Sequence, residues 1–113
     1  MEPARSAPPY EVESRTLHAV RPGFRILELR ISPAQAVPWH RHSAIRDTFY
    51  VLEGRVRIQL LAPREAVELG PGDVYTIPPL RPHRVANAGD GPATFLNLQG
   101  LGTYDFIPVD PPD

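Results

Sequence analysis

Residues 48–60, TFYVLEGRVRIQL, contain two strand patterns joined by a short turn. Residues 55–60 alternate strictly between polar and apolar side chains, so one face of this strand would meet a core and the other water. Residues 48–52 are β-branched, aromatic or apolar, a composition typical of a strand. Because only Glu53 and Gly54 separate the two runs, the stretch predicts a tight hairpin.

Similar short runs continue along the chain, separated by turns rich in glycine and proline. No proline-free stretch shows the 3.6-residue apolar period of an amphipathic helix. Further strands are expected at Phe24–Ile31, Ala66–Leu69, Val74–Ile77, His83–Asn87 and Thr94–Gln99. About seven or eight short strands with almost no helix indicate an all-β protein, folded as an antiparallel β-barrel or a double-sheet jelly roll.

The length of 113 residues favours a single domain. Many of the 15 prolines gather near the two ends of the chain. Proline disfavours helix and cannot donate a hydrogen bond to a sheet. We therefore expect an ordered barrel domain at residues 12–107, between extended proline-rich tails at 1–11 and 108–113.

The composition excludes several kinds of chemistry. The chain has no cysteine, which excludes disulfides, thiolate catalysis and cysteine-ligated metal clusters. All 12 basic residues are arginine, so no lysine can form a Schiff base. A net charge of −1 argues against a nucleic-acid partner. The apolar runs are far shorter than a membrane span, and no signal peptide is visible, so a cytoplasmic location without membrane contact is expected.

Three of the four histidines form a pattern that indicates a site. His40 and His42 are two residues apart, so in an extended segment both imidazoles project from one face. His83 is followed two residues later by the apolar Val85, which suggests that His83 also faces the interior. Buried imidazoles need partners, and a divalent metal can partner several of them together with a carboxylate. The alternative is a pair of surface histidines in an arginine-rich loop, and His18 stands alone as a surface or structural residue.

The spacing around the first pair resembles a known family motif. The series His40-x-His42-x4-Asp47-x6-Gly54 resembles the first motif of the cupin superfamily, G(x)5HxH(x)3–4E(x)6G. The resemblance extends to Gly54, the glycine that follows the predicted strand at 48–52.

The second cupin motif, G(x)5PxG(x)2H(x)3N, is matched by Gly72-x5-Pro78-x-Leu80-x2-His83-x3-Asn87. Only 17 residues separate the two motifs, which is similar to the small single-domain bacterial cupins. The resemblance covers about residues 34–87 and implies a cupin-like barrel.

The chain departs from the family pattern at three positions. Ala34 and Leu80 stand where the family has glycine, and Asp47 replaces the glutamate that binds metal. Aspartate is one methylene shorter, so Asp47 would bind the metal less closely, bind it through water, or leave a site of three histidines. An outward-facing carboxylate is the alternative for Asp47. The resemblance implies the metal ligands His40, His42 and His83, with Asp47 as the fourth.

Other residues near these motifs are candidates for a pocket or for catalysis. Phe49 shares a strand face with Asp47 and is a candidate for the pocket wall, or plain core. Asn97 and Gln99 share a face that lines either the pocket mouth or solvent. Arg81 precedes His83 by two residues, where it would hold a substrate carboxylate, or remain a solvated loop arginine.

Two more aromatic side chains, Tyr104 and Phe106, could form a lid over the barrel mouth or cap its core.

The resemblance implies one divalent transition metal ion per chain, of iron, manganese, nickel or zinc. The expected function is that of a metal-dependent cupin enzyme, of the dioxygenase, isomerase or lyase type, acting on a small oxygen-rich organic substrate with Asp47 as a candidate base. The alternative is a non-catalytic cupin that binds a small molecule through its metal. The resemblance to small cupins implies a homodimer. A small barrel with extended ends also has strand edges to cover, which favours a dimer.

Overall fold

The structure is a computed structural model, and it describes residues 10–112. Most of the predicted N-terminal tail, at 1–11, therefore lies outside the described residues. Within residues 10–112 the chain forms ten strands and no helix. The strands are β1 (Ser14–Arg21), β2 (Phe24–Ile31), β3 (Ala36–Arg41), β4 (Arg46–Glu53), β5 (Val56–Leu60), β6 (Glu65–Leu69), β7 (Val74–Ile77), β8 (His83–Asn87), β9 (Ala93–Gly100) and β10 (Ile107–Pro108).

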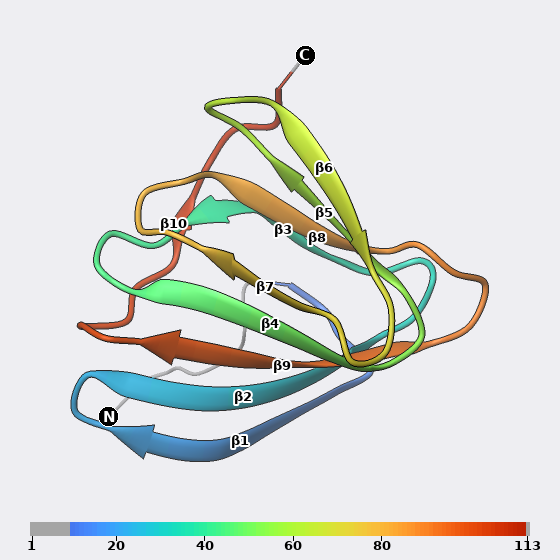
Figure 1. Ribbon diagram of the computed structural model, residues 1–113, viewed down its shortest axis with the longest axis horizontal. Helices are drawn as coiled ribbons and strands as arrows, with labels where there is room; N and C mark the ends of the chain where they lie inside the picture. Colours follow the sequence, from blue (N-terminus) through green and yellow to red (C-terminus); the bar gives the residue numbers. More distant parts are fainter. Residues whose placement is uncertain (1–9, 113) are drawn as a thin grey trace.

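The strands form two five-stranded antiparallel sheets that face each other (Figure 1). Sheet A has the order β1-β2-β9-β4-β7, and sheet B has the order β10-β3-β8-β5-β6. The sheets approach each other at one end and separate at the other, as Figure 1 shows on its right and left sides. The predicted all-β, double-sheet class is confirmed in its jelly-roll form, because the two sheets do not close into one barrel.

The apolar core lies between the sheets, where the alternating strands place their inward side chains. Every other residue of β2 is buried at Leu27, Leu29 and Ile31, with 2% exposure or less. The alternating run in β5 is buried completely at its apolar positions. Phe49 and Phe95 fill the centre between the sheets, with ring centroids 5.7 Å apart. The period-2 pattern of the sequence therefore identified the core faces correctly.

The predicted hairpin at Glu53-Gly54 is wrong in its pairing. The turn is there, but β4 pairs with β7 and β9 in sheet A, whereas β5 pairs with β6 and β8 in sheet B. The chain crosses between the sheets at Gly54, which has a φ of +77°. A Cβ at this position would lie 2.5 Å from the carbonyl oxygen of Pro92. Glycine is therefore required for the crossing and not for a hairpin.

Two strands have no clear signal in the sequence. Strand β1 is almost entirely exposed and pairs only at its β2 side, with a register shift between Leu17 and Ala19. Strand β10 pairs with β3 through Ile107 and Pro108, and the amide of Val109 donates to the carbonyl of Trp39. The segment expected to be a C-terminal tail from residue 108 thus begins with backbone contacts to sheet B.

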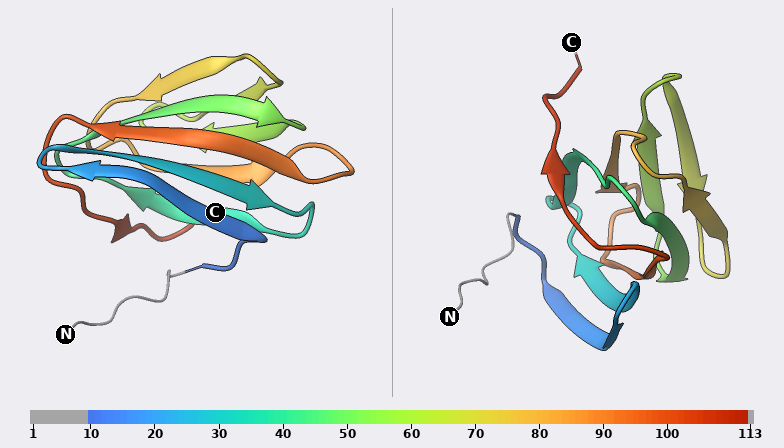
Figure 2. Two further views of the ribbon diagram at one scale, coloured as in Figure 1. Left: turned by 90° about the horizontal axis from the view of Figure 1, so that it is seen from below. Right: turned by 90° about the vertical axis from the view of Figure 1, so that its left-hand side faces the viewer.

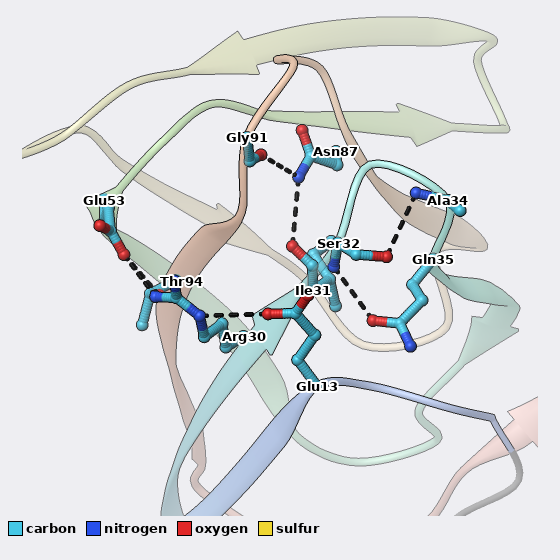
Figure 3. A network of polar contacts seen from close by, with 10 residues as sticks. All are labelled: Glu13, Arg30, Ile31, Ser32, Ala34, Gln35, Glu53, Asn87, Gly91 and Thr94. Atoms are coloured by element: carbon cyan, nitrogen blue, oxygen red, sulfur yellow. Dashed lines mark hydrogen bonds and ion pairs between the residues drawn. The ribbon is translucent and has the colours of Figure 1, made fainter.

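A polar network ties the strand ends together at the end of the sandwich where β2 and β4 finish (Figure 3). Arg30 donates to Glu53 at 2.6 Å, to Glu13 at 3.2 Å and to Thr94 at 3.2 Å. Asn87 donates to the backbone carbonyls of Ile31 and Gly91. These bonds hold sheet A to the β8–β9 turn and leave the opposite end of the sandwich for the site.

Several apolar side chains of sheet A remain exposed: Tyr50, Leu52, Val74 and Leu98. Homodimer formation stays a prediction. The described residues include no helix long and apolar enough to cross a membrane.

Replacement of Gly54 by alanine tests the crossing between the sheets. We expect Gly54→Ala to lower the free energy of unfolding by about 2–4 kcal/mol, since a left-handed backbone and a steric clash add together. Gly72→Ala is the matched control, because Gly72 has a φ of +87° but nothing within 4 Å of an added Cβ. It should cost only about 1–2 kcal/mol. Urea unfolding measures both, and equal losses would show that the close approach to Pro92 carries no cost.

Candidate metal centre

Four side chains that could bind a metal meet between the separated ends of the two sheets. His40 lies in β3, His42 directly follows it, His83 begins β8 and Asp47 lies in β4. Strands β3 and β8 are paired with His40 opposite His83, which brings the two motifs together. All four side chains are buried, with 3% exposure or less, and one ligand atom from each lies within 4.8 Å of the others.

Each of the three histidines is held through its Nδ1 atom by a backbone carbonyl. His40 Nδ1 donates to Pro38 at 2.7 Å, His42 Nδ1 to Asp105 at 2.5 Å and His83 Nδ1 to Arg81 at 2.9 Å. A carbonyl oxygen can only accept, so the proton of each neutral ring stays on Nδ1. Each Nε2 then offers a lone pair, which is the arrangement that carbonyl partners impose on metal-binding histidines.

The carboxylate of Asp47 is shared between two amides and two imidazoles. Its Oδ1 accepts hydrogen bonds from Asn97 at 2.8 Å and from Gln99 at 3.3 Å, both from β9. Its Oδ2 lies 3.1 Å from His42 Nε2 and 3.4 Å from His83 Nε2. The amides fix one oxygen and turn the other toward the histidines.

Burial and charge set the protonation of this group. Burial would raise the pKa of Asp47, but the hydrogen bond with His42 and the attraction of His42 and His83 hold this pKa well below its usual range. Burial also lowers the pKa of His42, yet the hydrogen bond and charge of Asp47 outweigh it and raise that pKa. Burial, together with the charge of His83, lowers the pKa of His40 to about 3. His40 is therefore neutral at physiological pH, and the contact with Asp47 favours the protonated form of His42.

The residues fit a divalent transition metal. His83 Nε2 is buried and has no hydrogen-bond partner among the described residues, although it points at the centre of the group. Burying such an atom without a partner costs about 1–3 kcal/mol. Three imidazoles and one carboxylate are a donor set that suits iron, manganese, nickel or zinc. A metal ion would satisfy His83 and replace the proton between His42 and Asp47.

The cavity over these ligands is small and covered. It has a volume of about 10 Å³, about the room that one water molecule needs. The segment 101–106, here named the closing segment, passes from β9 in sheet A to β10 in sheet B across the separated ends (Figures 1 and 2). Phe106 stacks on His40 with ring centroids 4.3 Å apart, and Tyr104 lies 5.5 Å from His42. Tyr10 adds a third ring, 5.8 Å from Phe106.

Asp105 anchors the closing segment to the ligands. Its backbone carbonyl accepts the hydrogen bond from His42, while its carboxylate accepts from the amide of Ser43 at 2.8 Å and from the Ser43 hydroxyl at 2.5 Å. The turn before β8 is tied to the same place, because the amide of Leu80 donates to the carbonyl of His42 at 2.7 Å. Leu80 has a φ of +72°, the conformation that glycine supplies in the family motif.

The structure brings most of the predicted site residues together. Phe49, Asn97 and Gln99 line the cavity together with His40, His42 and Asp47, so the polar face of β9 points inward. Tyr104 and Phe106 also line it.

Arg81 does not join this group, which corrects the expectation that it holds a substrate there. Its guanidinium donates to the carbonyls of Leu61 and Pro63 and to the carboxylate of Glu65. The side chain therefore faces the β5–β6 turn. It contributes to the site only through its own carbonyl, which accepts from His83.

Sequence reasoning missed two contributors to the site, Tyr10 and Asp105. Tyr10 lies before the first strand, in the part expected to be a tail. Asp105 acts partly through its backbone carbonyl, which leaves no mark in a sequence.

Comparison with known proteins agrees with this geometry. A structure from Klebsiella pneumoniae, described as a conserved protein with a double-stranded β-helix domain, superposes with a TM-score of 0.78 at 20% identity. That match covers 95% of this chain and 90% of the other. The oxalate decarboxylase of Bacillus subtilis, a protein with Mn(II) centres, has a TM-score of 0.71 at 22% identity, over 77% of this chain and 24% of the other. Both likenesses show the shared fold.

A sequence relative and a family match complete the comparison. An uncharacterized protein of Methanocaldococcus jannaschii is 37% identical over 57 residues, which are 50% of this chain and 44% of the relative. The chain thus spans less than half the length of that relative. Residues 27–99 match the cupin domain family, and this match includes all four candidate ligands. Because the match covers more than half of the chain, the protein belongs to the cupin domain family.

Proposed function

We propose that this chain binds one divalent transition metal ion through His40, His42, His83 and Asp47 and acts there as an enzyme on a small, oxygen-rich organic molecule. The observation that carries the proposal is the buried group of four ligand atoms within 4.8 Å. The Nε2 of His83, which makes no hydrogen bond in the described part of the chain, supports it, since an ion would complete the set. The Mn(II) centres of oxalate decarboxylase, which has the same fold, also support the binding of a metal by this chain.

The protein residues have separate roles in this proposal. The four ligands hold the ion, which when bound supplies Lewis acidity to a substrate oxygen. Asn97 and Gln99 orient Asp47 through its Oδ1 atom. The closing segment excludes bulk water, which strengthens every electrostatic contact inside the cavity.

Two phenols are available as proton donors. Besides His40, His42 and Asp47, Tyr10 and Tyr104 are the titratable side chains that line the cavity in the described part of the chain. Burial raises the pKa of both phenols, so each keeps its proton at neutral pH. A substrate that takes up a proton during an isomerisation or elimination would find a donor at the cavity wall.

A non-catalytic metal-anchored binding protein is the second candidate. It is favoured by the tight cover over the cavity and by the use of Asp47 as a ligand, which leaves no free carboxylate there as a base. Turnover distinguishes the two functions. The metal-loaded protein is incubated with small hydroxy acids, keto acids, sugar acids and phenols while oxygen uptake and product formation are followed. Binding without any product would overturn the enzyme proposal.

Metal content should depend on the histidines more than on the carboxylate. We expect His83→Ala to lower bound metal from about one ion per chain to a small fraction, since it removes a ligand from a buried site. Asp47→Ala should weaken metal binding without abolishing it, because three imidazoles remain. His18→Ala is the control, because His18 is exposed and pairs with Glu28 away from the site. Elemental analysis of the purified proteins gives the result, and a fully loaded His83→Ala protein would contradict the assignment.

The stability of the metal-free protein should rise with pH between about 3 and 6.5, because of His40. The folded state resists protonation of His40 down to a pKa of about 3, whereas the unfolded chain binds that proton near the ordinary value of 6.5. The unfolded state therefore binds more protons across this window, and acid favours unfolding. The raised pKa of His42 makes stability depend on pH only above about pH 6.5, and the lowered pKa of Asp47 does so only below about pH 3.8. Neither group therefore contributes to the slope in this window.

Urea unfolding at pH 4 to 6.5 in the presence of a chelator isolates the contribution of His40. In His40→Gln the slope of unfolding free energy against pH should be smaller than in the wild type by about one proton, or about 1.4 kcal/mol per pH unit. An unchanged slope would mean that the folded protein protonates His40 as easily as the unfolded chain does.

A further inference from the structure

Half-buried Arg25 places two buried guanidinium nitrogens, neither of which has a hydrogen-bond partner in the described part of the chain, at the mouth of the metal centre. It lies on β2 two residues before Leu27, which lines the cavity, so the alternation of the strand turns both side chains to the same face. Its Nε and Nη2 atoms are buried and make no hydrogen bond to any of residues 10–112. Buried N–H donors without a hydrogen bond are costly, which indicates a site kept for a partner.

The two free nitrogens lie on the same edge of the guanidinium plane. This edge binds a carboxylate through two parallel hydrogen bonds, the strongest geometry available to arginine. Arginine keeps its charge even though burial lowers its pKa from the ordinary value.

Tyr104 separates Arg25 from the cavity. The guanidinium carbon of Arg25 lies 3.8 Å from the centroid of the Tyr104 ring. Tyr104 lines both the inner cavity and an outer hollow of about 360 Å³, and Arg25 lines only the outer hollow. The inner cavity is too small for an organic ligand, so a ligand has to displace the ring. Rotation of the Tyr104 side chain would open the way while Asp105 keeps its bond to His42.

Gln99 offers the complementary group. It lies directly opposite Arg25 in the pairing of β2 with β9. Its Nε2 donates to Asp47, but its Oε1 is buried and has no hydrogen-bond partner in the described part of the chain. The mouth of the site therefore combines two free donors on Arg25 with one free acceptor on Gln99.

We propose that Arg25 is the specificity-determining residue of this site and selects a small 2-hydroxycarboxylate. The carboxylate accepts from Nε and Nη2 of Arg25, and the hydroxyl donates to Oε1 of Gln99, beside the metal ligands. The proposal rests on the proposed function and names its substrate class.

Calorimetric titration of the metal-loaded protein tests the proposal with three probes. Glycolate has both groups, glycolamide lacks the negative charge and acetate lacks the hydroxyl. Wild-type protein should bind glycolate more tightly than either of the others. Arg25→Gln should weaken glycolate binding at least about tenfold, the usual effect of losing a charge-assisted pair, and leave glycolamide nearly unchanged.

Two further variants separate recognition from a structural role. Arg25→Lys keeps a positive charge but loses the paired donors, so glycolate affinity should fall between those of the wild type and Arg25→Gln. Arg57→Gln is the matched control, because it removes an equal charge from an exposed ion pair with Glu68. Equal losses for glycolate and glycolamide in Arg25→Gln, no loss for either, or no preference for glycolate in the wild type would each overturn the proposal.

The failure of this proposal can be told apart from that of the metal site. Metal content is measured on the same samples, and the titrations are repeated on the metal-free protein. Bound metal without an effect of Arg25 on glycolate would overturn the assignment of Arg25 alone. A preference for glycolate that depends on Arg25 in a protein that binds no metal would support Arg25 and overturn the proposed function.

Discussion

The buried carboxylate of Asp47 is the constraint on which the arrangement of this protein depends. A charge with 1% exposure survives in a β-sandwich only if hydrogen bonds and opposite charges compensate for its lost water. Here the compensation comes from both sheets, with Asn97 and Gln99 on sheet A and His83 on sheet B. The burial of this charge explains three features of the fold. They are the separated ends of the sheets, the position of β8 beside β3 and the inward polar face of β9, which together surround the carboxylate with polar partners.

Much of the fold was predictable because it follows from short-range patterns. Strict alternation in β5 and on the core face of β2 fixes which side chains are buried, and the structure agrees. The histidines were also predictable, since the spacing of a ligand motif within one strand is visible in the sequence. Whether β4 and β5 pair with each other is not a local property. The same Glu53-Gly54 turn serves a hairpin or a crossing, and packing against Pro92 decides between them.

The features that sequence reasoning missed depend on the backbone or on distant partners. Asp105 holds His42 through a carbonyl, which any residue possesses. Arg81 was expected at the site because it precedes His83 by two residues, but it lies before β8 begins, where the alternation of a strand does not set its direction. The carbonyls of the β5–β6 turn offered its guanidinium better partners. Strand β1 is exposed along most of its length, so it has no apolar pattern that would predict it from the sequence. It is held as a strand by its pairing with β2.

The anchoring of the closing segment has a consequence for the exchange of the ion itself. The carbonyl that positions His42 is that of Asp105, one of the six residues of the closing segment that covers the cavity. Ser43 donates a hydrogen bond to the carboxylate of the same residue. Rotation of one aromatic side chain would admit a small ligand, but release of the ion would also require His42 to turn away. That motion breaks the hydrogen bond from His42 to the Asp105 carbonyl and loosens the closing segment over the cavity. Exchange of the ion is thereby linked to local unfolding of the chain after β9, so a chelator would strip the ion at the rate of that opening.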